Sequence, residues 1–110
     1  MYRDIPRELW ANVLEAFTER NAQRPTLIQI DSPEFGAQEQ ERGFPLRGIA
    51  YDRRDDRISI MLGELEGAEP HLTPSISDIE SLSIGSGGAG EGREVIRIAH
   101  DDSQTFVWVK

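Results

Sequence analysis

The residues best able to do chemistry in this sequence are two histidines and a large set of carboxylates. There are two His, no Cys, and 20 Asp and Glu. A bound metal asks for three or four convergent ligands, which here would be His71, His100 and carboxylates such as Asp101 and Asp102. The two histidines lie far apart in the sequence, and a solvated turn explains residues 100–102. We therefore expect no metal site.

Paired carboxylates are the second candidate, because acid–base catalysis needs two carboxyl groups at a set separation with different pKa values. Glu39 and Glu41 share one phase of a polar segment. Together with His71 in the mouth of a barrel, they are the alternative functional interpretation, a small acid–base enzyme. Alternating acids on an exposed strand are more often a block to edge pairing. We assign no catalytic residues.

A glycine-rich segment at residues 85–92 could suggest a nucleotide site. Gly85, Gly87 and Gly90 have the dinucleotide-binding spacing, but that motif works only before a helix, and residues 95–98 alternate like a strand. Glu91 stands where a phosphate-binding loop needs Lys. We interpret the segment as a flexible loop and predict no cofactor.

Aromatic residues offer a recognition surface, although a small domain needs most of them in its core. The candidates are Trp10, Phe44, Tyr51, Phe106 and Trp108. The pair Phe44-Pro45 follows Arg42-Gly43 and precedes a predicted strand, where an aromatic ring can be exposed on a rim. The recognition residues that we predict are Phe44, Pro45 and Tyr51.

Composition limits the partners and the location. The 110 residues carry 12 Lys and Arg against 20 Asp and Glu, a formal net charge of -8. Nucleic acid and anionic membrane both favour cationic surfaces, so we expect neither as a partner. No apolar run approaches the ~20 residues of a membrane helix. Residues 2–4 are polar where a secretory signal would be apolar, and there is no Cys, so we expect a cytoplasmic protein.

The elements that must position these residues begin with an amphipathic helix. Apolar residues at positions 9, 10, 13, 14 and 17 recur three and four apart, which predicts a helix over about residues 6–20. Pro6 suits its first turn. Because a helix of this length is marginal alone in water, its apolar stripe must pack on the rest of the chain.

Beyond Pro25 the apolar pattern changes to the alternation typical of strands. The clearest hairpins have turns at residues 53–56 and 100–103. Residues 70–84 are irregular, because the phases of Ile76 and Ile79 conflict, and a bulge or one helical turn at residues 77–80 would reconcile them. The predicted strands are residues 26–30, 34–42, 46–52, 57–62, 94–99 and 104–109, with a less regular segment at 70–84.

These elements predict an α+β fold in one domain over residues 1–110. We expect the N-terminal helix to pack on a curled antiparallel sheet or small open barrel of about six strands between residues 26 and 109. The glycine-rich segment at 85–92 would form a flexible loop.

Three motifs stand in a recognisable order. They are Ile5-Pro6-Arg7-Glu8 with Trp10, then Gly36-Ala37-Gln38 with Glu39 and Glu41, then Pro45-Leu46-Arg47-Gly48-Ile49-Ala50-Tyr51-Asp52. Their combination resembles a family of small bacterial proteins catalogued as domain of unknown function 5335. The likeness spans nearly the whole chain and departs from the family in the insert at 85–92. It implies a bacterial, single-domain protein and brings no catalytic residue, cofactor or substrate.

The sequence thus favours a non-catalytic binding or protein-interaction module. The edge strands of its sheet could pair with a second copy, giving a homodimer, or with an unidentified protein partner. The acid–base enzyme at Glu39, Glu41 and His71 is the alternative, so whether the chain is an enzyme stays open at this point.

Overall fold

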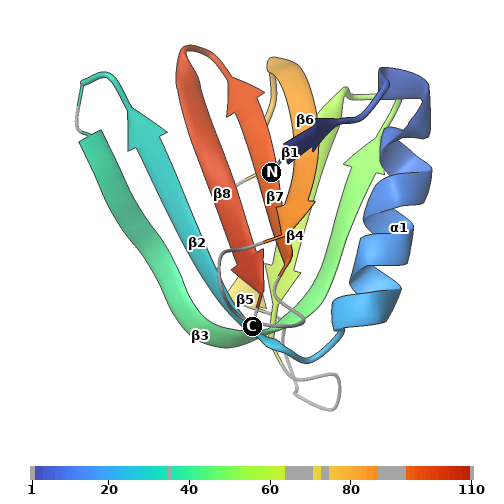
Figure 1. Cartoon of the computed structure of the whole chain (residues 1–110), viewed down its shortest axis with the longest axis vertical. Coiled ribbons are helices and arrows are strands. Elements are labelled where there is room, and N and C mark those ends of the chain that lie inside the picture. Colours follow the sequence, from blue (N-terminus) through green and yellow to red (C-terminus); the bar gives the residue numbers. More distant parts are fainter. Residues whose placement is uncertain (1, 35, 64–70, 73–74, 87–93, 110) are drawn as a thin grey trace.

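The structure, a computed structural model, describes residues 2–34, 36–63, 71–72, 75–86 and 94–109, with the side chains of 37–43, 71–72 and 86 excepted. Figure 1 shows its elements. In chain order they are β1 (Tyr2–Asp4), the 3-10 turn η1 (Arg7–Leu9), α1 (Trp10–Asn21), β2 (Pro25–Ser32), β3 (Gly36–Asp52), β4 (Arg57–Leu62), β5 (His71–Leu72), β6 (Ile79–Ser86), β7 (Glu94–His100) and β8 (Ser103–Val109).

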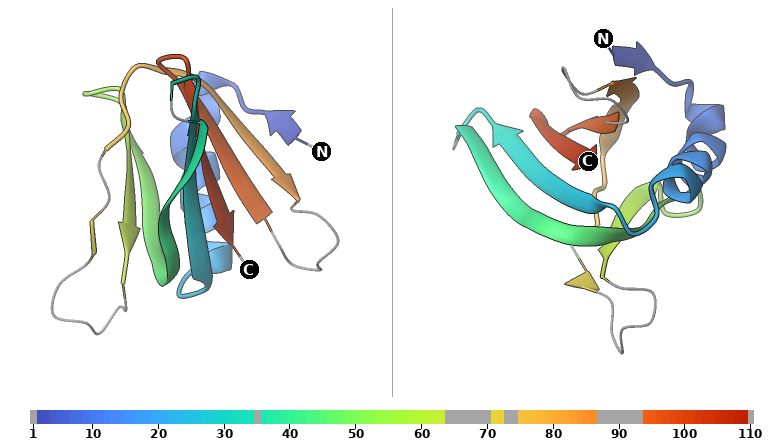
Figure 2. Two further views of the ribbon diagram at one scale, coloured as in Figure 1. Left: turned by 90° about the vertical axis from the view of Figure 1, so that its left-hand side faces the viewer. Right: turned by 60° about the horizontal axis from the view of Figure 1, so that its bottom comes forward.

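The strands form one antiparallel sheet in the order β1-β6-β7-β8-β2-β3-β4-β5. The α+β class and the curled sheet are confirmed (Figure 2). The expected count of about six strands is wrong, because the described sheet has eight, seven of them three residues or longer and β5 of two. The strands β1 and β5 are too short to show a period-2 pattern in the sequence.

Strand β3 is the longest element and the reason the sheet curls. Its first half pairs with β2 and its second half with β4, and the change of partner falls between Pro45, opposite Pro25, and Leu46, opposite Leu62. Proline lacks an N–H, so it is tolerated where a strand leaves one partner for the next. The sequence predicted two strands separated near Pro45. The structure has a single bent strand instead.

The helical prediction is correct in place and differs in detail. The 3-10 turn takes the first positions, and Leu9 is 43% exposed, so it does not belong to the buried stripe. The buried side chains of α1 are Trp10, Leu14, Phe17 and Asn21. Thr18 fixes the helix to β3, because the Ile49 N–H donates to its Oγ1 at 3.0 Å.

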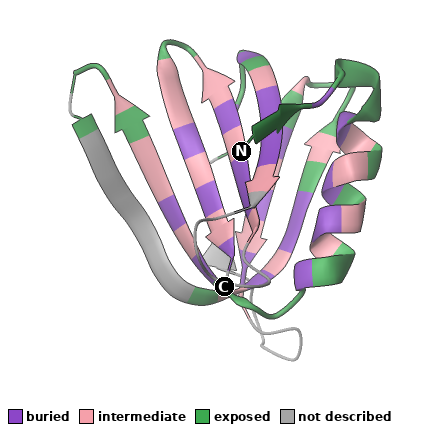
Figure 3. Cartoon of the chain, viewed as in Figure 1, coloured by how far each residue is buried: buried purple, intermediate pink, exposed green. Residues whose placement is uncertain are grey.

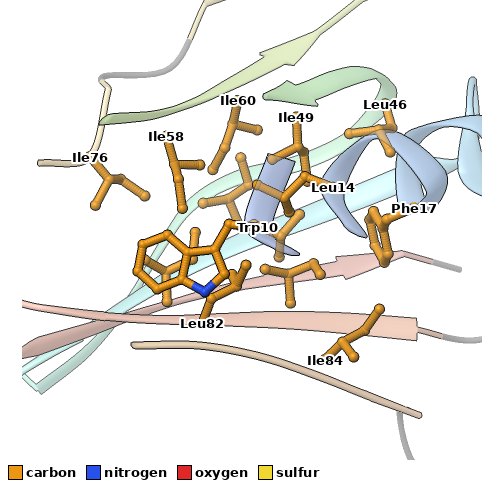
Figure 4. Close-up of a cluster of buried hydrophobic side chains, with 14 of the residues drawn as sticks. Trp10, Leu14, Phe17, Leu46, Ile49, Ile58, Ile60, Ile76, Leu82 and Ile84 are labelled. Atoms are coloured by element: carbon orange, nitrogen blue, oxygen red, sulfur yellow. The ribbon is translucent and has the colours of Figure 1, made fainter. Parts of the chain in front are cut away.

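The hydrophobic core lies between α1 and the concave face of the sheet (Figure 4). Trp10 is its largest side chain and is 2% exposed. Its Nε1 donates to the Ile5 carbonyl at 2.8 Å, so the buried indole N–H is satisfied. The core therefore unites Ile5, α1 and both halves of the sheet, as the amphipathic stripe predicts.

The irregular segment before β6 resolves as a bulge. Ile76 pairs with Ile58 in an isolated bridge, and Asp78 has a φ of 55°. The register of β6 against β7 shifts between Ile79 and Ser81. The bulge that the conflicting apolar phases predicted is confirmed, and the alternative helical turn is not formed. Of the predicted loop at 85–92, the first two residues end β6 and the others lie outside the described residues.

Candidate recognition surface

The hairpin of β7 and β8 positions the surface that stands out in this structure. Its pairing runs from Glu94 opposite Val109 to His100 opposite Ser103, which leaves a two-residue turn. Both turn residues, Asp101 and Asp102, have positive φ values of 42° and 62°. That conformation is the one a type I′ hairpin turn requires, and Asp tolerates it better than most residues. The predicted hairpin is confirmed, with a tighter turn than expected.

The two faces of this hairpin differ. Ile96, Ile98 and Val107 point to the core and are fully buried. The alternate positions, including Arg97, Phe106 and Trp108, lie on the outer face and are half-buried. Figure 3 shows the resulting alternation along the strands. The outer face continues onto the neighbouring strands, because Leu27 of β2 is opposite Trp108 and Ser83 of β6 is opposite Arg97.

On that outer face, Tyr2, Arg97, Phe106 and Trp108 form what we call the outer aromatic cluster. The rings of Phe106 and Trp108 are nearly parallel, 21° apart, with centroids 6.1 Å from each other. The Tyr2 ring lies 6.5 Å from Phe106. The guanidinium of Arg97 sits over the Tyr2 ring at 4.7 Å, within cation–π range. Residues far apart in the sequence thus form one continuous patch.

A buried polar network fixes the cluster from beneath. Ser83 is fully buried and donates from Oγ to Asp4 Oδ1 at 2.6 Å. Arg97 Nη2 donates to the same Oγ at 3.4 Å. These bonds hold the edge strand β1 against β6 and orient the Arg97 guanidinium over the Tyr2 ring. The cluster is therefore already ordered before any partner arrives.

Chemically, this arrangement suits recognition. Tyr, Trp and Arg are the residues that most often dominate binding energy at protein interfaces. Rings that are already held in place lose little conformational entropy on binding. The guanidinium of Arg97 and the neighbouring carboxylate of Asp4 are both hydrogen-bonded to Ser83. The cluster thus has the composition of a contact surface rather than of an acid–base pair.

The predicted recognition residues do not form one surface. Phe44 is 42% exposed and Pro45 is half-buried, at the bend of β3. Tyr51 lies near the other end of that strand, roughly 20 Å away at ~3.3 Å per residue. Its ring meets Trp10 edge-on at 5.1 Å. Tyr51 therefore supports the core, whereas Phe44 and Pro45 stay together at the rim.

Tyr51 also belongs to a group that we call the Arg7 clasp. Its hydroxyl donates to Asp56 Oδ1 at 2.5 Å, and Arg7 Nη1 pairs with the same oxygen. Arg7 Nη2 donates to the Ile79 carbonyl at 2.9 Å, and its guanidinium lies 4.2 Å from the centre of the Trp10 ring. The hydrogen bond with Tyr51 and the charge of Asp56 raise the pKa of Arg7. The clasp joins η1 to the β3–β4 turn and to β6.

The alternative acid–base site rests on side chains outside the described residues. The backbone places Glu39 opposite Gln29 and Glu41 opposite Ile28, on the first half of β3. His71 is opposite Leu62, on the other side of the bend. The three residues thus lie on strands β3 and β5, with β4 between them in the sheet.

Three of the metal candidates, His100, Asp101 and Asp102, lie at the β7–β8 turn. Within the described part of the chain, no three His, Asp or Glu side chains are grouped to hold a metal ion. His100 Nε2 instead lies 2.7 Å from Thr105 Oγ1, and burial lowers the pKa of its ring.

Among the described helices, none is long and apolar enough to span a bilayer.

Comparison with known proteins gives a family but no function. The model of a family of unknown function, DUF5335, matches residues 1–97. No curated protein and no solved structure matches the chain. The match includes Tyr2 and ends at Arg97, so Phe106 and Trp108 lie beyond it. Because the matched region covers most of the 110 residues, the chain belongs to the DUF5335 family.

Proposed function

We propose that this protein is a non-catalytic interaction module that binds another protein through the outer face of β1, β6, β7, β8 and β2. The observation that carries the proposal is the outer aromatic cluster. Its rings are held in place by Arg97 and by the Asp4–Ser83 hydrogen bond, yet they are not needed to close the core. A protein that left large aromatic rings on the solvent side of a sheet would gain little stability from them.

The irregular pairing of β3 with β2 favours the outer face of the sheet, rather than the edge of β3, as the binding site. Among the described strands, none pairs with the outer edge of residues 36–44. The pairing of β3 with β2, however, shifts register between Thr26 and Leu27 and again between Ile28 and Gln29. Bulges of this kind twist an edge away from regular pairing. A homodimer through that edge is therefore the less favoured form of the proposal.

Site-directed photo-crosslinking in the source cells tests the proposal. We replace Phe106 by a photoreactive phenylalanine analogue, and in a control we replace Leu9, which is more exposed than Phe106 and lies on η1. We expect a discrete adduct from position 106 and none from position 9. The partner, once purified, should bind the native chain and lose at least about tenfold in affinity with Phe106→Ser. Equal labelling from both positions would contradict the proposal.

The predicted pair Phe44 and Pro45 enters the proposal as a second contact. Phe44 is exposed at the bend of β3, where an aromatic side chain can contact a partner. A photoreactive analogue at position 44 should then label the same partner as position 106. A different partner, or no adduct, would limit the interface to the outer aromatic cluster.

For the location of the protein we propose the cytoplasm, in line with the absence of Cys.

The acid–base enzyme is the second candidate, and its support is the sequence alone. Glu39→Gln with Glu41→Gln asks whether the two acids contribute to the protein interface instead. If the crosslinked partner still binds this double variant, the two acids are not part of that interface.

A further inference from the structure

The charge at one end of the outer face indicates the chemistry of a partner. The strand registers place the end of β2, the β7–β8 turn and the start of β6 at the same end of the sheet, seen at the top of Figure 1. Every exposed ionisable side chain that these three segments carry there is an acid. They are Asp31, Glu34, Asp78, Glu80, Asp101 and Asp102.

The positive charge on the same face, that of Arg97, already has partners within the protein. Among the described residues of β1, β6, β7, β8 and β2, Arg97 is the cation in phase with the outer aromatic cluster. It lies over Tyr2 and bonds to Ser83. The face therefore combines an apolar centre with an acidic end, on a chain whose formal net charge is -8.

We infer that the partner bound by this face is a basic polypeptide segment, with Lys or Arg next to an apolar centre. This inference rests on the proposed function and adds the chemistry of the partner. A second copy of the chain would bring another charge of -8 and another acidic end, which opposes association. A cationic segment is attracted to the acidic end while its apolar residues cover Phe106 and Trp108.

Two acids allow a clean test, because Asp101 and Asp102 both have positive φ. Asn tolerates that conformation as well as Asp does, so Asp101→Asn with Asp102→Asn removes two charges and keeps the turn. The matched control is Glu15→Gln with Glu19→Gln. It removes the same net charge from two exposed positions of α1, which packs on the opposite, concave side of the sheet.

The probes are three synthetic twelve-residue peptides with the same centre, Leu-Phe-Phe-Leu, flanked on each side by four Lys, four Ser or four Glu. Binding is measured by calorimetry, and the site by backbone amide shifts of the full chain. We expect the Lys peptide to bind about tenfold tighter than the Ser peptide and to shift amides of β7 and β8, with the Glu peptide weakest. Its affinity should fall with added salt.

The variants then distinguish the inference of a basic partner from the proposal that the outer face binds a protein. The Asn pair should weaken the Lys peptide severalfold and leave the Ser peptide unchanged, while the α1 control changes neither. Phe106→Ser should weaken both peptides. Equal binding of the Lys and Ser peptides through Phe106 would overturn the basic partner and leave the interaction face standing. Binding of the Lys peptide that ignores Phe106→Ser, or no binding of any peptide, would overturn the inference. A crosslink from position 106 to a second copy of the chain would do the same.

Discussion

The two faces of the β7–β8 hairpin both carry large apolar side chains but have opposite surroundings. Ile96 and Val107 face the core and are fully buried, whereas Arg97 and Phe106, one position away on each strand, face outward. On the inner face, large side chains lose their contact with water and stabilise the fold. On the outer face, aromatic rings remain half-exposed and are ordered by one another. Apolar content alone therefore does not identify the buried face of a strand, since the two faces differ in whether they join the shared hydrophobic core.

The largest effect is expected on the inner side, at Trp10. Trp10→Ala should lower the free energy of unfolding by about 3–5 kcal/mol, because it leaves a large cavity and removes the donor to the Ile5 carbonyl. Urea unfolding followed by circular dichroism measures it. If the variant does not fold, Trp10→Phe serves instead, with a smaller loss. A change below about 1 kcal/mol for Trp10→Ala would mean that the inner face does not hold the fold together.

A smaller loss is expected at the Arg7 clasp, which closes one end of the inner side. Arg7→Met should cost about 1 kcal/mol, because it removes the cation over Trp10 and the bond to the Ile79 carbonyl. Arg54→Met, an exposed change in the β3–β4 turn, is the control and should stay within about 0.5 kcal/mol. Equal losses in the two variants would show that the clasp contributes nothing specific.

At the end of the molecule opposite the Arg7 clasp, Glu94 connects β7 to α1 and makes the stability of the fold depend on pH. The hydrogen bond from Arg20 lowers the pKa of Glu94 from its usual 4.5, with a second bond from Asn21. Because the folded state depresses this pKa, the stabilisation is present above pH 4.5 and is lost as the pH falls through the lower folded value. Glu94→Gln should cost about 0.5–1 kcal/mol at pH 7.

Urea unfolding of both proteins across this pH range measures that difference. It should shrink toward zero as the carboxyl group protonates below pH 4.5. A gap that stays constant down to pH 2.5 would contradict the assigned direction.

The smallest effect on stability is expected on the outer face. Phe106→Ser should change the free energy of unfolding by no more than about 0.5 kcal/mol, because the two rings that it meets, Tyr2 and Trp108, are themselves accessible to solvent. The same urea experiment measures it, with Trp10→Ala as the contrast. A loss comparable to that of Trp10→Ala would place Phe106 in the core and remove the difference between the two faces.

The sequence predicted what local periodicity encodes. The stripe from Trp10 to Phe17 and the alternation of residues 57–62 specify a helix and a strand, and the structure has both. The outer aromatic cluster was missed because both phases of β8 carry large apolar residues, with Val107 and Val109 on one and Phe106 and Trp108 on the other. Only the greater bulk of the second phase, beside Arg97 on the preceding strand, could have indicated an exposed face.

Contacts between distant residues were beyond any pattern in the sequence. Arg7 meets Asp56, 49 positions later, and Asp4 meets Ser83, 79 positions later. Strand β1 has three exposed residues and no alternation to read. Its existence depends on β6, so it follows from tertiary structure rather than from local preference. The contacts of Tyr51 could not be read from the sequence for the same reason, since its partners Trp10 and Asp56 come from other elements.

The bent strand β3 has a consequence for how the molecule unfolds. It provides hydrogen-bond partners to β2 through one half and to β4 through the other. Neither side of the sheet can open alone without pulling the shared strand away from its remaining neighbour. Local melting is thereby coupled across the molecule, and denaturation is expected to be a single cooperative transition.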